Sequence, residues 1–351
     1  MQVAGREVLM FAGSNYLDLA GHPRVIAAAQ AAAEVYGTAA GGARLINGNL
    51  EIHDALEREL AEFAGREAAL LFSTGYMANL GVLTALAGPD DAIVSDSLNH
   101  ASIVDACRLS RAKIHVFRHN DPEDLARVAG QLAGFRRRIL VVDGVYSMDG
   151  DVARLRELVP IARAHDMVVV LDDAHGLGVL GSRGLGTAEL CGVQVDVQIG
   201  NLGKALGSFG AYVLCSATLR EWLLNTARSF VFTCALPPSA IGAARAALEI
   251  VRQEPERRAR LQSRAQQLRD GLRSRGWDTG PSTTQIVPAL VGDNRRTMVL
   301  CERALARGVY AQGIRYPSVP EGSARIRLTP MCSHTRDDID RVVALFAELA
   351  A

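Results

Sequence analysis

Seven short apolar runs, separated by segments with helical periodicity, constrain the fold of this chain more than any other feature. Helical periodicity is clear at 77–87 and 155–165. Strands that alternate with helices form βαβ units, so we predict an α/β fold with a mostly parallel seven-stranded sheet flanked by helices. The predicted strands are 68–72, 92–95, 114–117, 139–142, 168–171, 197–199 and 211–214. Ligands of such sheets bind beyond the carboxyl ends of the strands.

The ends of the chain predict additional parts. Residues 1–36 form an N-terminal segment with a strand at 8–11 and a helix at 23–36, and a glycine-rich loop at 37–48 precedes an amphipathic helix at 51–64. After Pro237 and Pro238 the pattern changes to that of a smaller α+β domain. We therefore expect an N-terminal segment at 1–36, a large domain at 37–236 and a small C-terminal domain at 237–351. The small domain is predicted to contain a long helical stretch at 240–275, strands at 285–290 and 324–329, a helix at 297–307 and a last helix from Asp337. Thr335 and Asp338 have capping-box spacing for this last helix.

Composition argues against several classes of function. The 351 residues include 38 basic and 38 acidic side chains, so no global charge attracts nucleic acid or an anionic membrane. No apolar run approaches the length of a membrane span, and the first residues lack a basic-then-apolar signal. The six cysteines form no C-x-x-C pair, which favours reduced thiols over disulfides or a zinc site. We expect a soluble cytoplasmic enzyme without a metal.

The segment 199–212, I-G-N-L-G-K-A-L-G-S-F-G-A-Y, is the first chemical candidate. Its lysine, Lys204, lies among glycines between two apolar runs. A desolvated lysine amine can form a Schiff base with a carbonyl group, and glycines let the backbone approach a ligand closely. The segment alone also fits an exposed loop lysine between Gly203 and Gly207.

The predicted strand at 168–171 ends in Asp172, Asp173, Ala174 and His175. An aspartate at the end of a buried strand loses hydration and needs a cationic or donor partner. A metal shared by Asp172 and His175 is one interpretation, although no third ligand is evident nearby. The protonated ring nitrogen of pyridoxal phosphate (PLP) is the better one, because PLP enzymes pair a Schiff-base lysine with an aspartate.

Polar residues follow other predicted strands as well, and each can be interpreted either as a ligand-binding residue or as a structural one. Ser73, Thr74 and Gly75 open a helix whose N-terminus can bind phosphate or can simply be capped by a hydroxyl. His100 follows the strand at 92–95, and its ring can stack on a planar cofactor or pack structurally. Ser147 lies in a polar turn whose sequence D-G-D also predicts an ordinary turn.

Six motifs, in this order, resemble those of the α-oxoamine synthases: G-G-A-R-L-I-N-G-N, S-T-G-Y-M-A-N, N-H-A-S-I, D-G-V-Y-S-M-D-G-D, D-D-A-H-G-L-G-V and L-G-K-A-L-G-S-F-G-A-Y. These are PLP-dependent enzymes of fold type I that condense an amino acid with an acyl-CoA. The resemblance implies a PLP-binding large domain and a homodimer with shared active sites. The first motif and R-Y-P-S-V-P-E-G-S-A-R-I-R-L-T look more like the branch that joins L-alanine to pimeloyl-CoA in biotin synthesis than the branch that joins glycine to acetyl-CoA.

The resemblance also implies roles for the residues around the cofactor ring. Lys204 would bind PLP covalently and later move the α-proton of the substrate. Asp172 would keep the pyridine nitrogen protonated. His175 and Ser147 would hydrogen-bond the phenolic oxygen, and His100 would stack on the ring and contact the substrate.

Further residues are implied to bind the cofactor phosphate and the substrates. The amides of Gly75 and Tyr76 would bind the phosphate, with Asn201 beside it and Thr233 reaching the phosphate of the neighbouring subunit. The implied substrate-binding residues of the small domain and N-terminal segment are Arg327, which would bind the amino-acid carboxylate, together with Ser318 and Asn15.

Two departures from the family pattern lead to specific expectations. Asn201 stands where the family usually has a threonine that donates to the phosphate, and the bulkier side chain predicts altered cofactor affinity. The family has a longer segment before the Asn15 region, with an arginine that meets the acyl substrate, so we expect either weaker acyl-CoA recognition here or a sequence shortened at its start. A protein that keeps the fold but not the activity is the alternative outside the enzymes. An aldolase or desulfurase on the same fold is a further alternative, but it would not explain Arg327.

Overall fold

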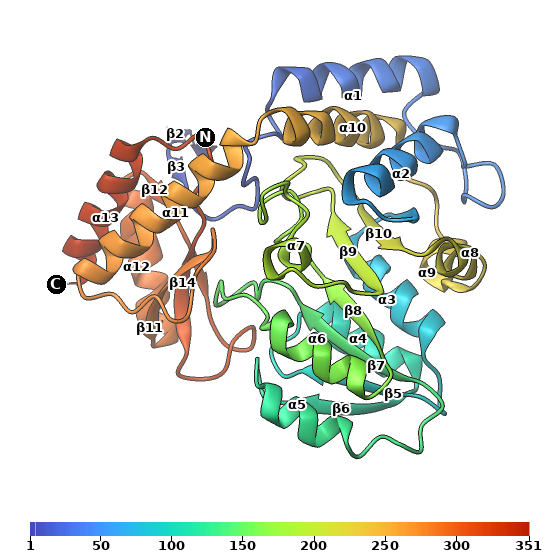
Figure 1. Cartoon of the computed structure of the whole chain (residues 1–351). Coiled ribbons are helices and arrows are strands. Elements are labelled where there is room, and N and C mark those ends of the chain that lie inside the picture. Colours follow the sequence, from blue (N-terminus) through green and yellow to red (C-terminus); the bar gives the residue numbers. More distant parts are fainter. Residues whose placement is uncertain (4, 351) are drawn as a thin grey trace. The chain divides into compact units, whose positions relative to one another are not determined.

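The computed structural model describes residues 1–3 and 5–350, which group into two compact units. The large unit comprises Leu19–Val145 and Ala153–Pro255. The small unit comprises Met1–Asp18, Tyr146–Val152 and the described residues from Glu256 onward. The elements of both units are labelled in Figure 1.

The large unit is built on the predicted seven-stranded sheet. Its strand order is β4-β10-β9-β8-β7-β5-β6, and all pairings are parallel except those of β10 with β4 and β9. The prediction of seven strands in a mostly parallel sheet is therefore confirmed. The strands are β4 (Ala68–Phe72), β5 (Ala92–Asp96), β6 (Lys113–Phe117), β7 (Arg138–Asp143), β8 (Met167–Asp172), β9 (Val197–Asn201) and β10 (Ala211–Cys215).

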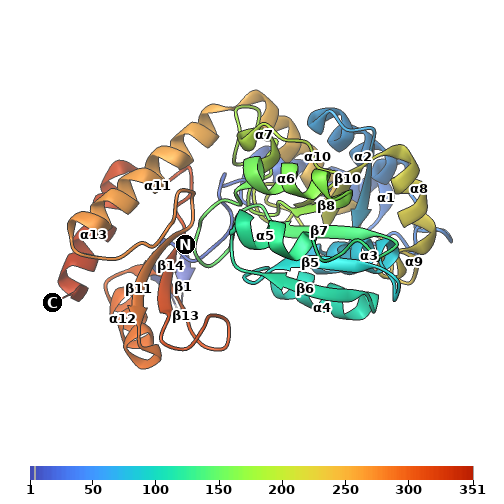
Figure 2. The same ribbon diagram turned by 60° about the horizontal axis from the view of Figure 1, so that its bottom comes forward.

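Helices cover both faces of this sheet. One face packs against α3 (Gly75–Leu86), α4 (Ala101–Ser110), α8 (Ala217–Thr226) and α9 (Arg228–Val231) in a continuous apolar core. Figure 2 shows α5 (Pro122–Ala129) and α6 (Leu155–Ala164) on the face opposite α4. Because both faces are covered, central-strand residues such as Ile93, Val141 and Val170 are fully buried, which explains why the strands read as apolar runs.

Three further helices of the large unit pack beside the sheet, and the short α7 (Thr187–Cys191) follows β8. The predicted helices at 23–36 and 51–64 are confirmed as α1 (Pro23–Tyr36) and α2 (Glu51–Ala64). α1 lies along α10 (Pro238–Gln253) (Figure 1). Gly242 permits this approach, because a Cβ there would lie 2.5 Å from the Ala28 carbonyl oxygen.

The helical stretch predicted at 240–275 consists of two helices. α10 ends at Gln253 and α11 (Glu256–Ser274) begins after Pro255. Proline lacks an amide hydrogen and disfavours helical geometry in the preceding residue, so it separates the two helices. The large unit consequently ends at Pro255, whereas the predicted boundary between domains lay at 236.

The small unit contains a three-stranded antiparallel sheet in the order β11-β14-β13. The first residues of the chain belong to this unit, because β3 (Leu9–Met10) pairs with β12 (Val309–Tyr310). The predicted capping box is present: the Asp338 amide donates to Thr335 Oγ1 at 3.1 Å and the Thr335 amide to Asp338 Oδ2 at 2.8 Å. The other elements are β1 (Gln2–Val3), β2 (Arg6–Glu7), β11 (Val287–Gly292), β13 (Gln312–Ile314), β14 (Ala324–Leu328), α12 (Asn294–Ala306) and α13 (Arg336–Ala350).

Candidate active site

The carboxyl ends of β4, β5, β7, β8 and β9 and the amino end of the antiparallel β10 lie at one edge of the large sheet. Asp143 pairs with Asp172 across β7 and β8, and Asp172 pairs with Ile199 across β8 and β9. Ala211 of β10 lies between Asn201 of β9 and Phe72 of β4. The segments that follow these strands are thus brought to the same edge, as expected from the sequence. They carry Gly75, Tyr76, His100, Asp172, His175, Asn201 and Lys204.

Lys204 lies in the turn after β9 and contacts His175. The Lys204 Nζ atom is 2.9 Å from His175 Nε2, and the histidine is buried. The turn depends on Gly207, which has a φ of +57° and where a Cβ would lie 2.4 Å from the Ala20 amide nitrogen. A side chain at this position would displace the backbone that presents Lys204.

Lys204 is one of two lysines in the chain. The remaining residues counted among the 38 lysines and arginines are all arginines. The second, Lys113, is exposed at the start of β6. This scarcity was a signal in the sequence that the motif analysis missed. It allows any lysine-specific chemistry to be assigned to one of two positions.

Asp172 is buried at the end of β8, and two donors hold its carboxylate. The Asn79 amide group donates to Oδ2 at 2.7 Å, and the Ala174 backbone amide donates to Oδ1 at 3.0 Å. Asn79 belongs to the S-T-G-Y-M-A-N motif, but no local pattern distinguishes it from its neighbours. The carboxylate is therefore fixed in orientation before any ligand binds.

His100 caps α4 and bonds to Asp143 at the end of β7. Its backbone amide donates to Asp143 Oδ2 at 2.7 Å, and its Nδ1 atom lies 2.7 Å from Ser102 Oγ. Burial lowers the pKa of His100, Lys204 lowers it further and Asp172 opposes this shift. Burial, reinforced by the charge of Asp172, raises the pKa of Asp143 well above its usual range. An uncharged His100 ring suits contact with a planar aromatic group.

The N-terminus of α3 forms a cradle beside Asn201. Thr74 caps the helix, its hydroxyl oxygen accepting from the Met77 amide at 3.1 Å. The amides of Gly75 and Tyr76 have no partner within the helix, because they belong to its first turn. The Asn201 Nδ2 atom lies 3.0 Å from the position that a Cβ on Gly75 would occupy. The space above these amides thus exists because residue 75 has no side chain.

These residues fit PLP. Lys204 offers an amine for the aldehyde, buried Asp172 an acceptor for the ring N–H, and the α3 cradle amide donors for the phosphate. The backbone amide of Gly203 donates to Asn201 Oδ1 at 2.7 Å, so the Nδ2 donor of Asn201 faces the cradle. Asn201 can therefore donate where the family usually has threonine. The described residues contain no group of three or more His, Cys, Asp or Glu side chains that could hold a metal.

Four of the predicted site residues belong to the small unit. Arg327 is buried on β14, and its guanidinium donates to the Ser147 carbonyl oxygen at 2.6 Å and to the Tyr16 hydroxyl at 3.3 Å. Asn15 donates to Asp18 Oδ1 at 3.0 Å. Ser318 lies on an exposed segment between β13 and β14. The segment 146–152 with Ser147 therefore belongs to the unit that carries Arg327.

Sequence comparisons identify the family. The model of the class I and II aminotransferases matches residues 6–346. An 8-amino-7-oxononanoate synthase of Geobacter sulfurreducens is 50% identical over 350 residues, which cover 98% of this chain and 89% of the relative. The chain belongs to the α-oxoamine synthase family. The resemblance stated from the motifs is confirmed.

Solved structures of other α-oxoamine synthases share this fold. Serine palmitoyltransferase of Sphingomonas wittichii superimposes with a TM-score of 0.96 at 34% identity, covering 99% of this chain and 88% of the other. A structure of SPT with PLP has the same TM-score and identity. The 8-amino-7-oxononanoate synthase of Francisella tularensis has a TM-score of 0.85 at 25% identity, covering 98% of each chain. The fold is that of the type I PLP-dependent transferases, and PLP is the cofactor of the family.

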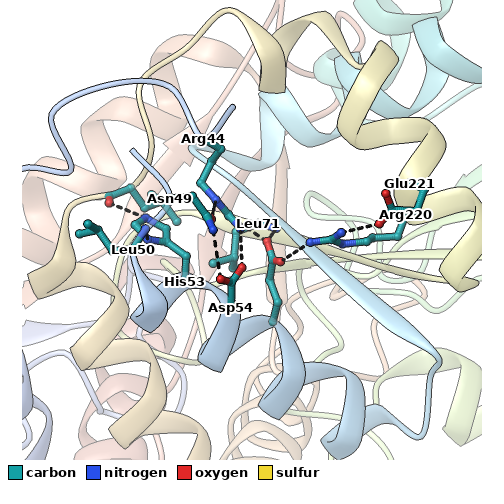
Figure 3. A network of polar contacts seen from close by, with 10 residues as sticks. Arg44, Asn49, Leu50, His53, Asp54, Leu71, Arg220 and Glu221 are labelled. Carbon is teal, nitrogen blue, oxygen red and sulfur yellow. Dashed lines mark hydrogen bonds and ion pairs between the residues drawn. The ribbon is translucent and has the colours of Figure 1, made fainter. Parts of the chain in front are cut away.

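A buried ion network supports the glycine-rich loop at 37–48 of the family's first motif (Figure 3). Arg44 Nη1 lies 2.9 Å from Glu57 Oε1, and Arg220 Nη2 lies 3.1 Å from Glu57 Oε2. The Leu71 backbone amide also donates to Glu57 Oε1 at 2.9 Å. Glu57 therefore joins the loop, α2, α8 and the end of β4, the strand that leads to Ser73 and the cradle.

His53, one turn before Glu57 on α2, joins the N-terminus of this helix to the segment that carries Thr233. The Leu50 amide donates to His53 Nδ1 at 3.2 Å, so Nε2 carries the hydrogen and donates to the Leu236 carbonyl oxygen at 3.0 Å (Figure 3). Burial lowers the pKa of His53, and Arg44 contributes to the same shift. Thr233 and Ser73 line a small cavity beside Arg44. A buried Arg–Glu pair in a glycine-rich loop has no short-range sequence signal, so these residues were missed.

Asp173 follows Asp172 but points into a different, fully buried environment. Its Oδ2 atom accepts from the Gln198 side chain at 2.8 Å and from the Thr187 backbone amide at 2.8 Å. A Cβ on Gly186 would lie 1.9 Å from this carboxylate, so only glycine fits at position 186. Burial raises the pKa of Asp173 to about 6.

We expect Asp173→Asn to stabilise the apoprotein at pH 7 but not at pH 4. The pKa of Asp173 is about 6 in the folded chain against 3.8 as the reference for the unfolded chain, so the folded state holds the proton more tightly. Ionisation therefore destabilises the fold as the pH rises through this window, by roughly 1–3 kcal/mol at pH 7. The neutral amide avoids this effect. Urea unfolding at both pH values measures the difference, and a variant that is less stable at pH 7 would contradict the shift.

Proposed function

We propose that the chain catalyses the decarboxylative condensation of L-alanine with pimeloyl-CoA, or another pimeloyl thioester, to 8-amino-7-oxononanoate, CoA and CO2 in biotin synthesis. The observation that carries this proposal is the 50% identity, over nearly the whole chain, to a curated synthase of that name. The strand-edge site supports it, because it offers a lysine, an aspartate and a phosphate cradle together.

The residues of the large unit would hold PLP. Lys204 binds the aldehyde carbon, Asp172 accepts the ring N–H, and the amides of Gly75 and Tyr76 bind the phosphate with Asn201. When bound, PLP supplies an electron sink for the electron pair left on the substrate Cα after proton removal. Asp172 supports this role by keeping the ring nitrogen protonated, since an ionised carboxylate favours the cationic partner.

Lys204 moves the proton at the substrate Cα. A neutral amine must accept this proton and later return it, and general acid–base catalysis requires the amine within hydrogen-bonding reach of the carbon. His175, 2.9 Å from Nζ, orients the lysine. His100 lies at the same sheet edge and remains uncharged at neutral pH, because burial lowers its pKa. We assign it to stacking on the cofactor ring and contact with the substrate.

Arg327 binds the carboxylate of the amino acid. Its bonds to the Ser147 carbonyl and the Tyr16 hydroxyl fix the plane of the guanidinium, which favours a charge-assisted contact of defined geometry. Ser318 and Asn15 are the other substrate-binding residues proposed in the small unit, and the family resemblance implies that Ser147 would hydrogen-bond the phenolic oxygen of the cofactor.

A homodimer completes the proposed site. Two neighbouring loops of the large unit, joined by the bond from the Ala235 amide to the Gly42 carbonyl at 2.9 Å, expose Ile46 at 83% and Phe232 at 71%. Exposed apolar side chains of this size favour burial against another chain. Thr233, next to Phe232, would then reach the phosphate bound by the second copy.

The proposed compartment is the cytoplasm. The six cysteines are all free thiols, four of them buried, as expected where thiols stay reduced. Among the described residues, no helix has both the length and the apolarity needed to cross a membrane.

One set of assays tests the proposal. The PLP-loaded protein is given L-alanine or glycine, each with pimeloyl-CoA or acetyl-CoA, and CO2 release is measured. We expect the highest kcat/KM for alanine with pimeloyl-CoA and a dimeric mass in light scattering. Preference for glycine with acetyl-CoA would assign the other branch of the family, and a PLP-loaded protein without turnover would indicate a non-catalytic homologue.

A further inference from the structure

A continuous chain of hydrogen bonds connects His100 to Asp172 beneath the sheet edge. His100 Nδ1 lies 2.7 Å from Ser102 Oγ, Asn79 Nδ2 donates to that hydroxyl at 2.9 Å, and the same nitrogen donates to Asp172 Oδ2 at 2.7 Å. All four residues belong to the large unit. Asn79 and Ser102 are each only 1% exposed, so bulk water does not compete for these bonds.

The orientation of the Asn79 amide follows from its partners. An ionised carboxylate only accepts hydrogen bonds, so the nitrogen and not the oxygen of Asn79 must face Asp172. Both N–H groups are then used, one for Asp172 and one for Ser102. The Asn79 oxygen is buried and has no hydrogen-bond partner. An unsatisfied buried acceptor destabilises a fold, so stability alone does not account for an asparagine here.

The helix that carries Asn79 also provides the phosphate cradle. Gly75 begins α3 and Asn79 lies one turn further along the same helix. The other donor to Asp172 is the backbone amide of Ala174, two residues further along the chain, which leaves the side-chain bond of Asn79 as the contact between the carboxylate and α3. The same helix, α3, therefore provides the amides of the phosphate cradle and the side chain that orients the Asp172 carboxylate.

We propose that Asn79 is a positioning residue for Asp172: it holds the carboxylate in the orientation that the ring nitrogen of PLP requires and links it through Ser102 to His100. This inference rests on the proposed use of PLP. Asn79 itself is assigned no contact with the cofactor or the substrate. Its effect on cofactor binding passes through Asp172.

A double-mutant cycle tests this role with PLP affinity as the readout. Asn79→Ala is expected to raise the PLP dissociation constant about 10-fold or more, the size of effect seen when a partner of a ligating group is removed. In an Asp172→Asn background the same substitution is expected to change the constant by less than about 2-fold, because the carboxylate it positions is gone. Equal effects in both backgrounds would overturn the proposal.

Two further variants make the result independent of folding defects. Asn79→Asp keeps the size of the side chain but replaces the donor by a second carboxylate, and we expect it to weaken PLP binding at least as much as alanine does. Ser102→Ala keeps the Asn79–Asp172 bond, so we expect less than about a 3-fold change. The thermal midpoint of each apoprotein shows whether it is folded.

The visible absorption band of bound PLP gives a second readout. We expect the pH midpoint of this band to move in Asn79→Ala and Asn79→Asp and to stay unchanged in Ser102→Ala. If the folded Asn79 variants keep the PLP affinity and the pH midpoint of the wild type, the inference about Asn79 is overturned and the proposed function is unaffected. If the wild-type chain binds no PLP, the proposed function fails instead, so the two failures are distinguishable.

Discussion

Lys204→Ala is expected to lower kcat by about 10⁴-fold or more, because the variant loses both the covalent anchor of the cofactor and the group that moves the α-proton. Steady-state turnover of alanine and pimeloyl-CoA measures this loss. Lys113→Ala is the matched control, since it removes the one other lysine, which is exposed at the start of β6. We expect the control to keep wild-type turnover.

A chemical measurement gives the same assignment without turnover. Borohydride reduction of the PLP-loaded protein fixes the cofactor on its amine, and peptide mass spectrometry then locates the label. With two lysines in the chain, we expect the label on Lys204 and none on Lys113. A label on Lys113, or a Lys204→Ala variant within about 10-fold of wild-type turnover, would contradict the assigned role.

Glu57→Ala is expected to lower the free energy of unfolding by about 3–5 kcal/mol, the usual effect of removing one partner from a buried ion pair. The variant leaves Arg44 without its partner at 2.9 Å and removes the acceptor of the Leu71 amide. Arg44 and Glu57 side chains are 7% and 5% exposed, so water does not replace the lost contacts. Urea unfolding of the apoprotein measures the effect.

Glu59→Ala is the matched control on the same helix. Glu59 pairs with Arg245, and the two side chains are 30% and 40% exposed, so solvent screens their attraction. We expect a loss of about 0–1 kcal/mol for this pair. Similar losses for the two glutamates would show that the network around Glu57 is not the main support of the loop at 37–48.

Much of the fold was predictable because its signals are local. The central strands are buried on both faces, so each appears as a continuous apolar run in the sequence. Helix α1 begins at the predicted Pro23, and Thr335 with Asp338 caps α13 as their spacing indicated. The positions of Asp172 at the end of β8 and of Lys204 just after β9 were also predictable, because each lies in a motif next to an apolar run.

Other features depend on contacts between residues far apart in the chain. Asn79 and Asp172 are 93 positions apart, and Arg220 and Glu57 are 163 positions apart. No local pattern indicates such pairs, since an asparagine in a helix or a glutamate on an amphipathic helix is most often solvated. The assignment of residues 1–18 and 146–152 to the small unit has the same origin.

The sequence by itself determined the order of the strands and helices along the chain, the family and the candidate residues at the strand ends, because periodicity and motifs are properties of neighbouring residues. Only the tertiary structure decided which donors hold Asp172, which charges surround Glu57 and where the large unit ends. These depend on strand register and helix packing, which bring distant side chains within hydrogen-bonding distance.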